Sequence, residues 1–223
     1  MCKKEQSTFA KLYLTAYNGL QAASWSYVLI KSLSFMFEKQ CYKGAFGNIE
    51  LELGVAQTAG LMEVVHGVTG LVRANPLLTF IQILSRIVVY WGILVAVPES
   101  RLQIGLPMLL VAWSIAEITR YLFYGLSLYN ACPPILTWCR YSFFIILYPI
   151  GVSGELLSIY SALPYVKERG LFSINLPNPY NFSFDYHLVL VITMLIYLPG
   201  LPKLYSHMLS QRSKVLYPPK EKQ

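Results

Sequence analysis

The sequence predicts an all-α membrane protein, a six-transmembrane-helix bundle that forms a single integral membrane domain over residues 1–223. Hydrophobic residues make up 55% of the chain and charged residues only 13%, a composition too apolar for a soluble domain. Six apolar stretches follow one another, each about 20 residues long, which is the length that a bilayer requires. The connections between them are too short to form a soluble domain, so any function must reside among the helices or at their ends.

The six predicted spans are separated by residues that favour turns. The spans cover about 12–37, 51–72, 77–97, 102–124, 135–162 and 184–209. The turns contain Pro76, Pro98, Pro133, Pro134 and the run NLPNPYN at 175–181, because proline tends to end a helix. In the first span, Asn18, Gln21 and Trp25 are expected to face the interior of the bundle.

The distribution of Lys and Arg predicts that both termini lie in the cytosol. An even number of spans leaves the termini on one side, and cytosolic segments of membrane proteins carry an excess of basic residues. With cytosolic termini, the inside segments contain Lys3, Lys4, Lys11, Arg73, Lys203, Arg212, Lys214, Lys220 and Lys222, and the outside loops contain Lys39, Lys43, Arg101, Lys167 and Arg169. The net charge of +7 does not indicate a nucleic-acid partner, because these residues form no dense basic patch.

Several charged residues lie in or near the predicted spans, and most of them have candidate partners. They are Glu63, Arg86, Glu117, Arg120, Arg140 and Glu155. Glu117 and Arg120, at positions i and i+3, can pair on one helix, and Gln82 shares a helix face with Arg86. Because paired charges inside a membrane often only hold helices together, a structural role is favoured for these residues over a chemical one.

Glu155 is different, because no basic residue lies within one turn of it on its own helix. Exposing a carboxyl group to hydrocarbon costs about 3 kcal/mol, so this side chain is expected to face protein or a cavity. Tyr148 lies seven residues earlier, on nearly the same helix face and about 10.5 Å away along the axis. Pro149 between them is expected to kink the helix, and Gly151 and Gly154 to leave space beside it. The pattern predicts a small cleft with a phenol near one end and a carboxylate near the other, a plausible acid/base pair.

The cysteines indicate no metal site and no disulfide framework. Cys2, Cys41, Cys132 and Cys139 form no CxxC pair and have no histidine at ligand spacing. We therefore expect neither a metal nor a cofactor.

The run YPIGVSGELLSIYSALP, from Tyr148 to Pro164, resembles the signature of the very-long-chain 3-hydroxyacyl-CoA dehydratases, also called protein tyrosine phosphatase-like proteins. The resemblance is closest to their plant Pasticcino-type members. Further blocks match in order over nearly the whole chain: YLTAYNGLQAASW, QTAGLMEVVHGVTGLVR, the segment from Gln82 to Arg86, WSIAEITRYLFYG, NFSFDYHL and YLPGLPKLYSHMLSQR.

This resemblance implies a multi-pass protein of the endoplasmic reticulum membrane that catalyses the third step of very-long-chain fatty acid elongation. In that step 3-hydroxyacyl-CoA loses water to give trans-2-enoyl-CoA. The catalytic tyrosine and glutamate of the family fall on Tyr148 and Glu155, with Glu155 preferred as the base and Tyr148 as the acid. The implied partners are the condensing enzyme, the ketoacyl-CoA reductase and the enoyl-CoA reductase of the same cycle.

Other residues are expected to support this site. The supporting polar set is Gln82, Arg86, Glu117, Arg120, Arg140 and Gly151. The CoA phosphates are expected to remain at the cytosolic face, near basic residues such as Lys11, Arg73 or Arg212.

Two alternatives do not require this chemistry. The segment from His66 to Arg73 has the spacing of the HCx5R loop of tyrosine phosphatases, but Gly67 occupies the position of the nucleophilic cysteine, which disfavours phosphatase activity. A phosphatase-like protein that binds phosphotyrosine proteins without cleaving them is one alternative, and a catalytically inactive membrane scaffold or transporter is the other. In a purely structural interpretation of the loop, Gly67 and Gly70 allow close helix packing.

Overall fold

The computed structural model describes residues 7–72, 75–177 and 179–217, which are almost entirely helical. The α-helices are α1 (Thr8–Lys39), α2 (Ala45–Ala59), α3 (Met62–Val68), α4 (Pro76–Ile87), α5 (Gly105–Ser127), α6 (Pro134–Ser142), α7 (Phe144–Arg169) and α8 (Tyr186–Leu216). A π-helical segment, η1 (Val88–Val95), continues α4, and a short 3-10 helix, η2 (Pro98–Leu102), precedes α5.

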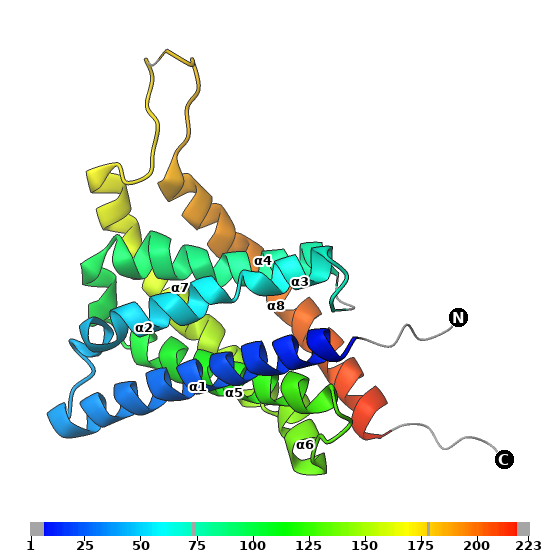
Figure 1. Cartoon of the computed structure of the whole chain (residues 1–223). Coiled ribbons are helices and arrows are strands. Elements are labelled where there is room, and N and C mark those ends of the chain that lie inside the picture. The colour runs from blue at the N-terminus through cyan, green and yellow to red at the C-terminus, as the bar shows by residue number, and fades with distance from the viewer. Residues whose placement is uncertain (1–6, 73–74, 178, 218–223) are drawn as a thin grey trace.

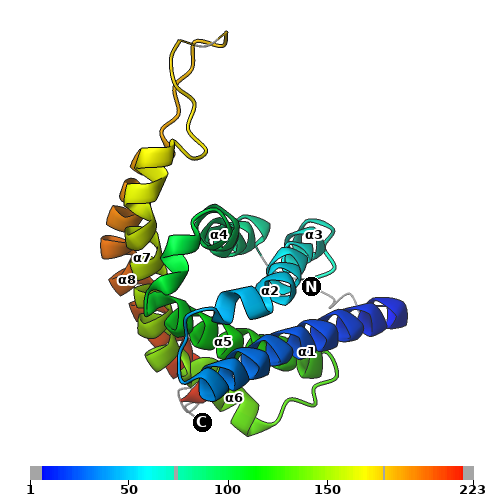
Figure 2. The same cartoon turned by 90° about the vertical axis from the view of Figure 1, so that its left-hand side faces the viewer.

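The helices run back and forth between two ends of the molecule (Figure 1). The start of α1, the end of α8 and the connection from α3 to α4 lie at one end, which we call the terminal end. The connections after α1 and before α5 lie at the opposite end. The connection from α7 to α8 projects beyond the helices as a hairpin in which Ile174 and Phe184 pair (Figures 1 and 2).

Among the described residues, four stretches are long and apolar enough to cross a membrane. These are Pro76–Val95, Gly105–Ser127, Phe144–Arg169 and Tyr186–Leu216. The described part of the chain is thus all-helical, with at least these candidate spans. The six-span topology and the cytosolic position of the termini remain predictions.

Two of the predicted spans are divided into separate helices. The second is interrupted at Gly60 and Leu61, between α2 and α3, and the fifth is interrupted at Phe143, between α6 and α7. α7 runs through Pro149 without ending, and the kink expected at Pro149 stays a prediction. Proline is tolerated inside membrane helices when neighbouring helices surround the freed backbone group.

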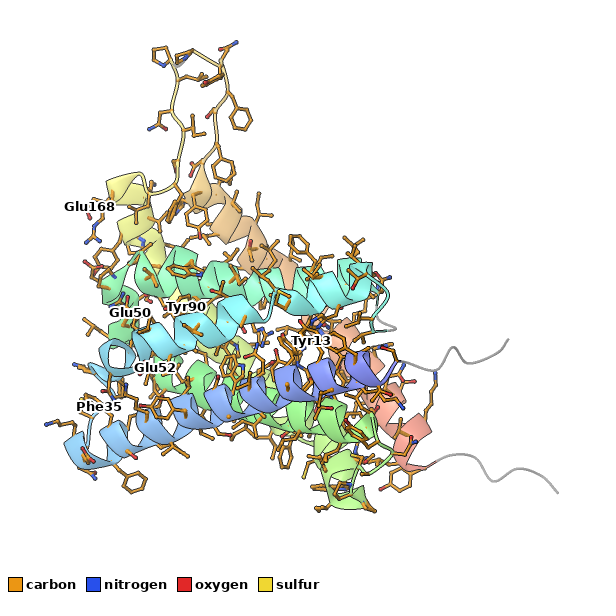
Figure 3. All side chains as sticks on the ribbon, viewed as in Figure 1. Tyr13, Phe35, Glu50, Glu52, Tyr90 and Glu168 are labelled. Carbon is orange, nitrogen blue, oxygen red and sulfur yellow. The ribbon has the colours of Figure 1, made fainter. Side chains whose placement is uncertain are left out.

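The core forms where α1, α2, η1, α5 and α7 meet, and it contains large side chains such as Trp25, Phe46 and Tyr121. The prediction that Asn18, Gln21 and Trp25 face the interior is confirmed, because all three are buried. The hydroxyl of Tyr90 in η1 donates a hydrogen bond of 2.5 Å to the backbone carbonyl of Glu50 in α2, which joins these two elements (Figure 3).

Gly154 brings α5 and α7 together rather than opening a space between them. A Cβ atom at Gly154 would lie only 2.7 Å from the carbonyl oxygen of Gly105 and from the backbone nitrogen of Leu109. Any side chain larger than hydrogen would push the two helices apart. The expected space beside Gly154 is therefore filled by the backbone of α5, and this close contact fixes α7, which carries Tyr148 and Glu155, against α5.

Candidate functional site

A cavity of about 560 Å³ lies among α4, α5, α6, α7 and α8. The predicted catalytic and supporting residues all line it: Tyr148, Glu155, Gln82, Arg86, Glu117, Arg120, Arg140 and Gly151. They come from four different helices, and the fold therefore brings together residues that lie up to 73 positions apart in the sequence, from Gln82 to Glu155.

The direction of each helix shows how far these residues lie from the terminal end of the bundle. α4 and α7 begin at the terminal end, whereas α5 and α8 end there (Figure 1). Gln82, Tyr148 and Met208 therefore lie closer to the terminal end than Trp113 and Glu155, which lie deeper in the bundle.

The carboxyl group of Glu155 is buried and is held by two neighbouring helices. The indole nitrogen of Trp113 in α5 donates a hydrogen bond of 2.8 Å to Oε1 of Glu155. The hydroxyl of Tyr197 in α8 donates one of 2.7 Å to Oε2. Both donors are neutral, and within the described part of the chain no Lys or Arg forms an ion pair with Glu155. Direct hydrogen bonds rather than an ion pair thus compensate this carboxyl group for its burial.

Sequence reasoning did not identify Trp113 or Tyr197 as site residues. Their positions along α5 and α8 carry no pattern that connects them with Glu155, which lies 42 residues away from each. A signal was nevertheless present, because Trp113 opens the block WSIAEITRYLFYG and Tyr197 opens the block YLPGLPKLYSHMLSQR.

Tyr148 is half-buried on the wall of the same cavity, two helical turns before Glu155. Its ring lies beside that of Tyr205 in α8, with 6.3 Å between the ring centroids. Among the residues that the structure describes, none forms a hydrogen bond with the Tyr148 hydroxyl, so this group is free to bind a ligand in the cavity.

The charged residues of the cavity wall form a network that extends to α3. The carboxylate of Glu117 forms two ion pairs, one with Arg86 in α4 and one with Arg120, each with 2.5 Å between nitrogen and oxygen. The second ion pair confirms the predicted pairing of Glu117 with Arg120. Arg120 also binds Glu63 of α3, at 2.7 Å, and the hydroxyl of Tyr121 donates to the same carboxylate at 2.5 Å. Two acids and two bases neutralise one another, as the structural interpretation of these residues expects.

Arg140 lies on the cavity wall near the terminal end. Its guanidinium group lies 5.9 Å from the ring centroid of Tyr124, and in the described ranges it forms no ion pair with a carboxylate. Of the other basic residues considered for CoA, Arg212 donates a hydrogen bond of 3.2 Å to Ser142. Lys11 lies in the first turn of α1, away from the cavity wall, and Arg73 lies outside the described residues.

The phosphatase-like segment contributes to packing. Its histidine, His66, is buried and accepts or donates a hydrogen bond of 2.9 Å with the hydroxyl of Tyr13 in α1 (Figure 3). A Cβ atom at Gly67 would lie 3.4 Å from Pro76, and Gly70 has a positive φ of 71° in the turn that follows α3. The contact at Gly67 supports the interpretation in which this glycine allows close packing. For Gly70 that interpretation is wrong, because a Cβ atom there would have no neighbour within 4 Å among the described residues, and its positive φ instead suits the turn. Among the described residues, no group of three or more His, Cys, Asp or Glu side chains could hold a metal ion.

The chain is similar to proteins of a known family. A family model described as "Protein tyrosine phosphatase-like protein, PTPLA" matches residues 57–218. Very-long-chain (3R)-3-hydroxyacyl-CoA dehydratase 1 of Ovis aries is 45% identical over 215 residues, which are 96% of this chain and 75% of the relative. Very-long-chain (3R)-3-hydroxyacyl-CoA dehydratase 2 of Mus musculus is 43% identical over 214 residues, 96% of this chain and 84% of the relative.

A plant relative is also similar. Very-long-chain (3R)-3-hydroxyacyl-CoA dehydratase PASTICCINO 2A of Oryza sativa subsp. japonica is 39% identical over 211 residues, 94% of this chain and 95% of the relative. The expectation of a particular closeness to plant members is wrong, because the animal relatives named above are more similar. No solved structure matches the chain.

Proposed function

The chain belongs to the protein tyrosine phosphatase-like family, that of the very-long-chain 3-hydroxyacyl-CoA dehydratases, and we propose that it converts very-long-chain 3-hydroxyacyl-CoA into trans-2-enoyl-CoA. One observation carries the assignment of the site. A carboxyl group held by two neutral donors and a phenol without a hydrogen-bond partner in the described chain line one cavity. This is the minimum that the reaction needs, since elimination of water requires a base, an acid and no redox step.

In the proposed mechanism, Glu155 removes a proton from C2 and Tyr148 donates a proton to the hydroxyl leaving C3. The electron pair of the broken C2–H bond forms the C2–C3 double bond as the C3–O bond breaks, and the departing hydroxide leaves as water. The proton on Glu155 then returns to Tyr148 through solvent, which restores the site. The hydrogen bonds from Trp113 and Tyr197 support this division of roles, because they fix the orientation of the carboxyl group without neutralising it.

The substrate is proposed to enter from the terminal end, which the distribution of basic residues predicts to be cytosolic. The thioester and the hydroxyl group would lie in the cavity, and the CoA phosphates would remain at the terminal end. Arg140 supports this orientation, because it lines the cavity near that end without a carboxylate partner among the described residues. Family membership supports a location in the endoplasmic reticulum and function beside the condensing enzyme, the ketoacyl-CoA reductase and the enoyl-CoA reductase, as the third step of elongation.

A direct assay separates the dehydratase from a scaffold or transporter. The purified protein in detergent is incubated with a very-long-chain 3-hydroxyacyl-CoA, and the formation of trans-2-enoyl-CoA is followed by chromatography. We expect turnover without any added metal or cofactor. Absence of product from a folded, monodisperse sample would favour the non-catalytic alternatives.

Tyr197→Phe tests whether Tyr197 positions the catalytic carboxyl group. The variant removes one hydrogen bond to Glu155 while keeping the ring in place. Because a hydrogen bond to a charged group contributes roughly 1.5–3 kcal/mol, kcat should fall by about 10- to 100-fold. KM should change little, since the lost contact is with the protein and not with the substrate.

Tyr160→Phe is the matched control for this experiment. Tyr160 is exposed on α7 and does not line the cavity, so removal of its hydroxyl should leave kcat unchanged. A Tyr197→Phe protein with unchanged kcat, or with an effect on KM alone, would contradict the positioning role.

A further inference from the structure

A second hollow, of about 320 Å³, lies between α7 and α8. We call it the α7–α8 groove. Pro149, Ser153 and Leu156 line it from α7, and Pro202 and Tyr205 line it from α8. Figure 2 shows these two helices side by side along one edge of the molecule.

The groove and the cavity share part of their walls. Tyr148, Val152 and Leu201 line both spaces. The two hollows therefore adjoin each other at the side chain of Tyr148, the proposed catalytic acid.

The two hollows differ in polarity. The cavity contains Arg86, Glu117, Arg120, Arg140 and Glu155 in its wall. Among the described residues, no charged side chain lines the groove, and the polar side-chain groups in its wall are the hydroxyls of Ser153 and two tyrosines. The cavity thus suits a hydroxyl and a thioester, whereas the groove suits an alkyl chain.

The groove opens on the outer surface of the helices. Pro149, Ser153 and Pro202 are exposed, although they lie within α7 and α8. Both helices are candidate membrane spans, so the groove is expected to open toward hydrocarbon when they cross a bilayer. The neighbouring surface of α8 is apolar as well, because Leu195 and Leu198, which line neither hollow, are exposed within the two turns before Pro202.

We propose that the acyl chain of the substrate leaves the reaction cavity through the α7–α8 groove, so that its distal carbons lie in the bilayer. The inference rests on the proposed function for the identity of the ligand. It explains how a cavity of about 560 Å³ accepts very long chains: the cavity encloses only the reacting end, and the lipid phase receives the remainder.

Ser153→Trp tests this path, because Ser153 lines the groove and not the cavity. A tryptophan there fills the groove. We expect kcat/KM for 3-hydroxyarachidoyl-CoA to fall by about tenfold or more, the size of effect that follows from blocking a hydrophobic subsite. The value for 3-hydroxyoctanoyl-CoA, whose chain is short enough to stay within the cavity, should remain unchanged. Tyr160→Trp places the same bulk on the exposed face of α7, away from both hollows, and should affect neither substrate.

Equal losses for both substrates, or no loss for either, would overturn the proposed path. A second measurement does not depend on turnover. A very-long-chain acyl-CoA with a diazirine in the middle part of its chain, on the carbons proposed to lie in the groove, should label the segments 149–156 and 201–205 on irradiation, whereas labelling of α4 or α5 would place this part of the chain elsewhere and overturn the proposal. Labelling of the groove by a protein without dehydratase activity would show that the proposed function fails while the acyl path holds.

Discussion

Glu155→Gln and Tyr148→Phe should each abolish most of the dehydratase activity, with kcat lowered by about 10²- to 10⁴-fold, the usual contribution of a general base or acid. Glu155→Gln removes the only carboxylate that lies in the cavity without an ion pair in the described chain. Tyr148→Phe removes the proposed proton donor to the leaving hydroxyl. The double variant should be little worse than either single variant, because both groups act in one elimination step and their effects are not additive. The measurement is the rate of enoyl-CoA formation at saturating substrate.

The chain offers a matched control for each of these substitutions on the same helix. Glu168→Gln makes the same chemical change at the exposed end of α7, far from the cavity (Figure 3), and Tyr160→Phe removes an exposed hydroxyl. Both should retain full activity. Normal turnover by the Tyr148→Phe, Glu155→Gln double variant would end the assignment of the site.

The relation between Tyr148 and Glu155 was predictable because it depends on helix geometry alone. Two residues seven positions apart on one helix must lie on nearly the same face, whatever surrounds that helix. The pairing of Glu117 with Arg120 was predictable for the same reason, since i and i+3 side chains are neighbours. Local spacing therefore identified the residues of the cavity wall that share a helix.

Contacts between helices could not be predicted in the same way. Trp113 and Tyr197 reach Glu155 only because α5 and α8 lie against α7 at one particular rotation and depth. That rotation depends on close contacts such as the one between Gly154 and the backbone of Gly105, which no single helix pattern reveals. The pairing of Glu63 with Arg120 across 57 residues was likewise among several possible pairings of the buried acids and bases.

The sequence patterns also could not predict where two of the spans are divided into separate helices. Pro149 and Pro164 lie inside α7 without ending it, whereas the interruption before α7 falls at Phe143, a residue without any local preference for ending a helix. The second span breaks at Gly60, where the backbone amide bonds to the carbonyl of Gln57 instead of continuing the α-helical pattern. In membrane helices, neighbouring helices decide where such breaks are tolerated, so proline and glycine are weaker boundary signals than in soluble proteins.

Arg120→Met should destabilise the protein strongly. Arg120 is mostly buried, with 13% of its side chain exposed, and binds both Glu63 and Glu117. Removing one partner of a buried ion pair costs about 3–5 kcal/mol, because a buried charge is left without compensation. We expect a large fall in the melting temperature of the purified protein in detergent. Arg169→Met, which breaks the exposed ion pair between Arg169 and Glu99, is the control and should change the melting temperature little, since water screens that pair.

The partners of Arg120 also determine which second substitution should restore stability. Without Arg120, Glu117 keeps its ion pair with Arg86, but Glu63 keeps only the hydroxyl of Tyr121. Glu63 is therefore the uncompensated charge, and Glu63→Gln in the Arg120→Met background should recover part of the lost stability. Glu117→Gln in that background should instead lower stability further, because it leaves Arg86 unpaired. The opposite order of the two double variants, or independent and additive effects of the two substitutions, would show that the network does not couple α3 to the cavity wall.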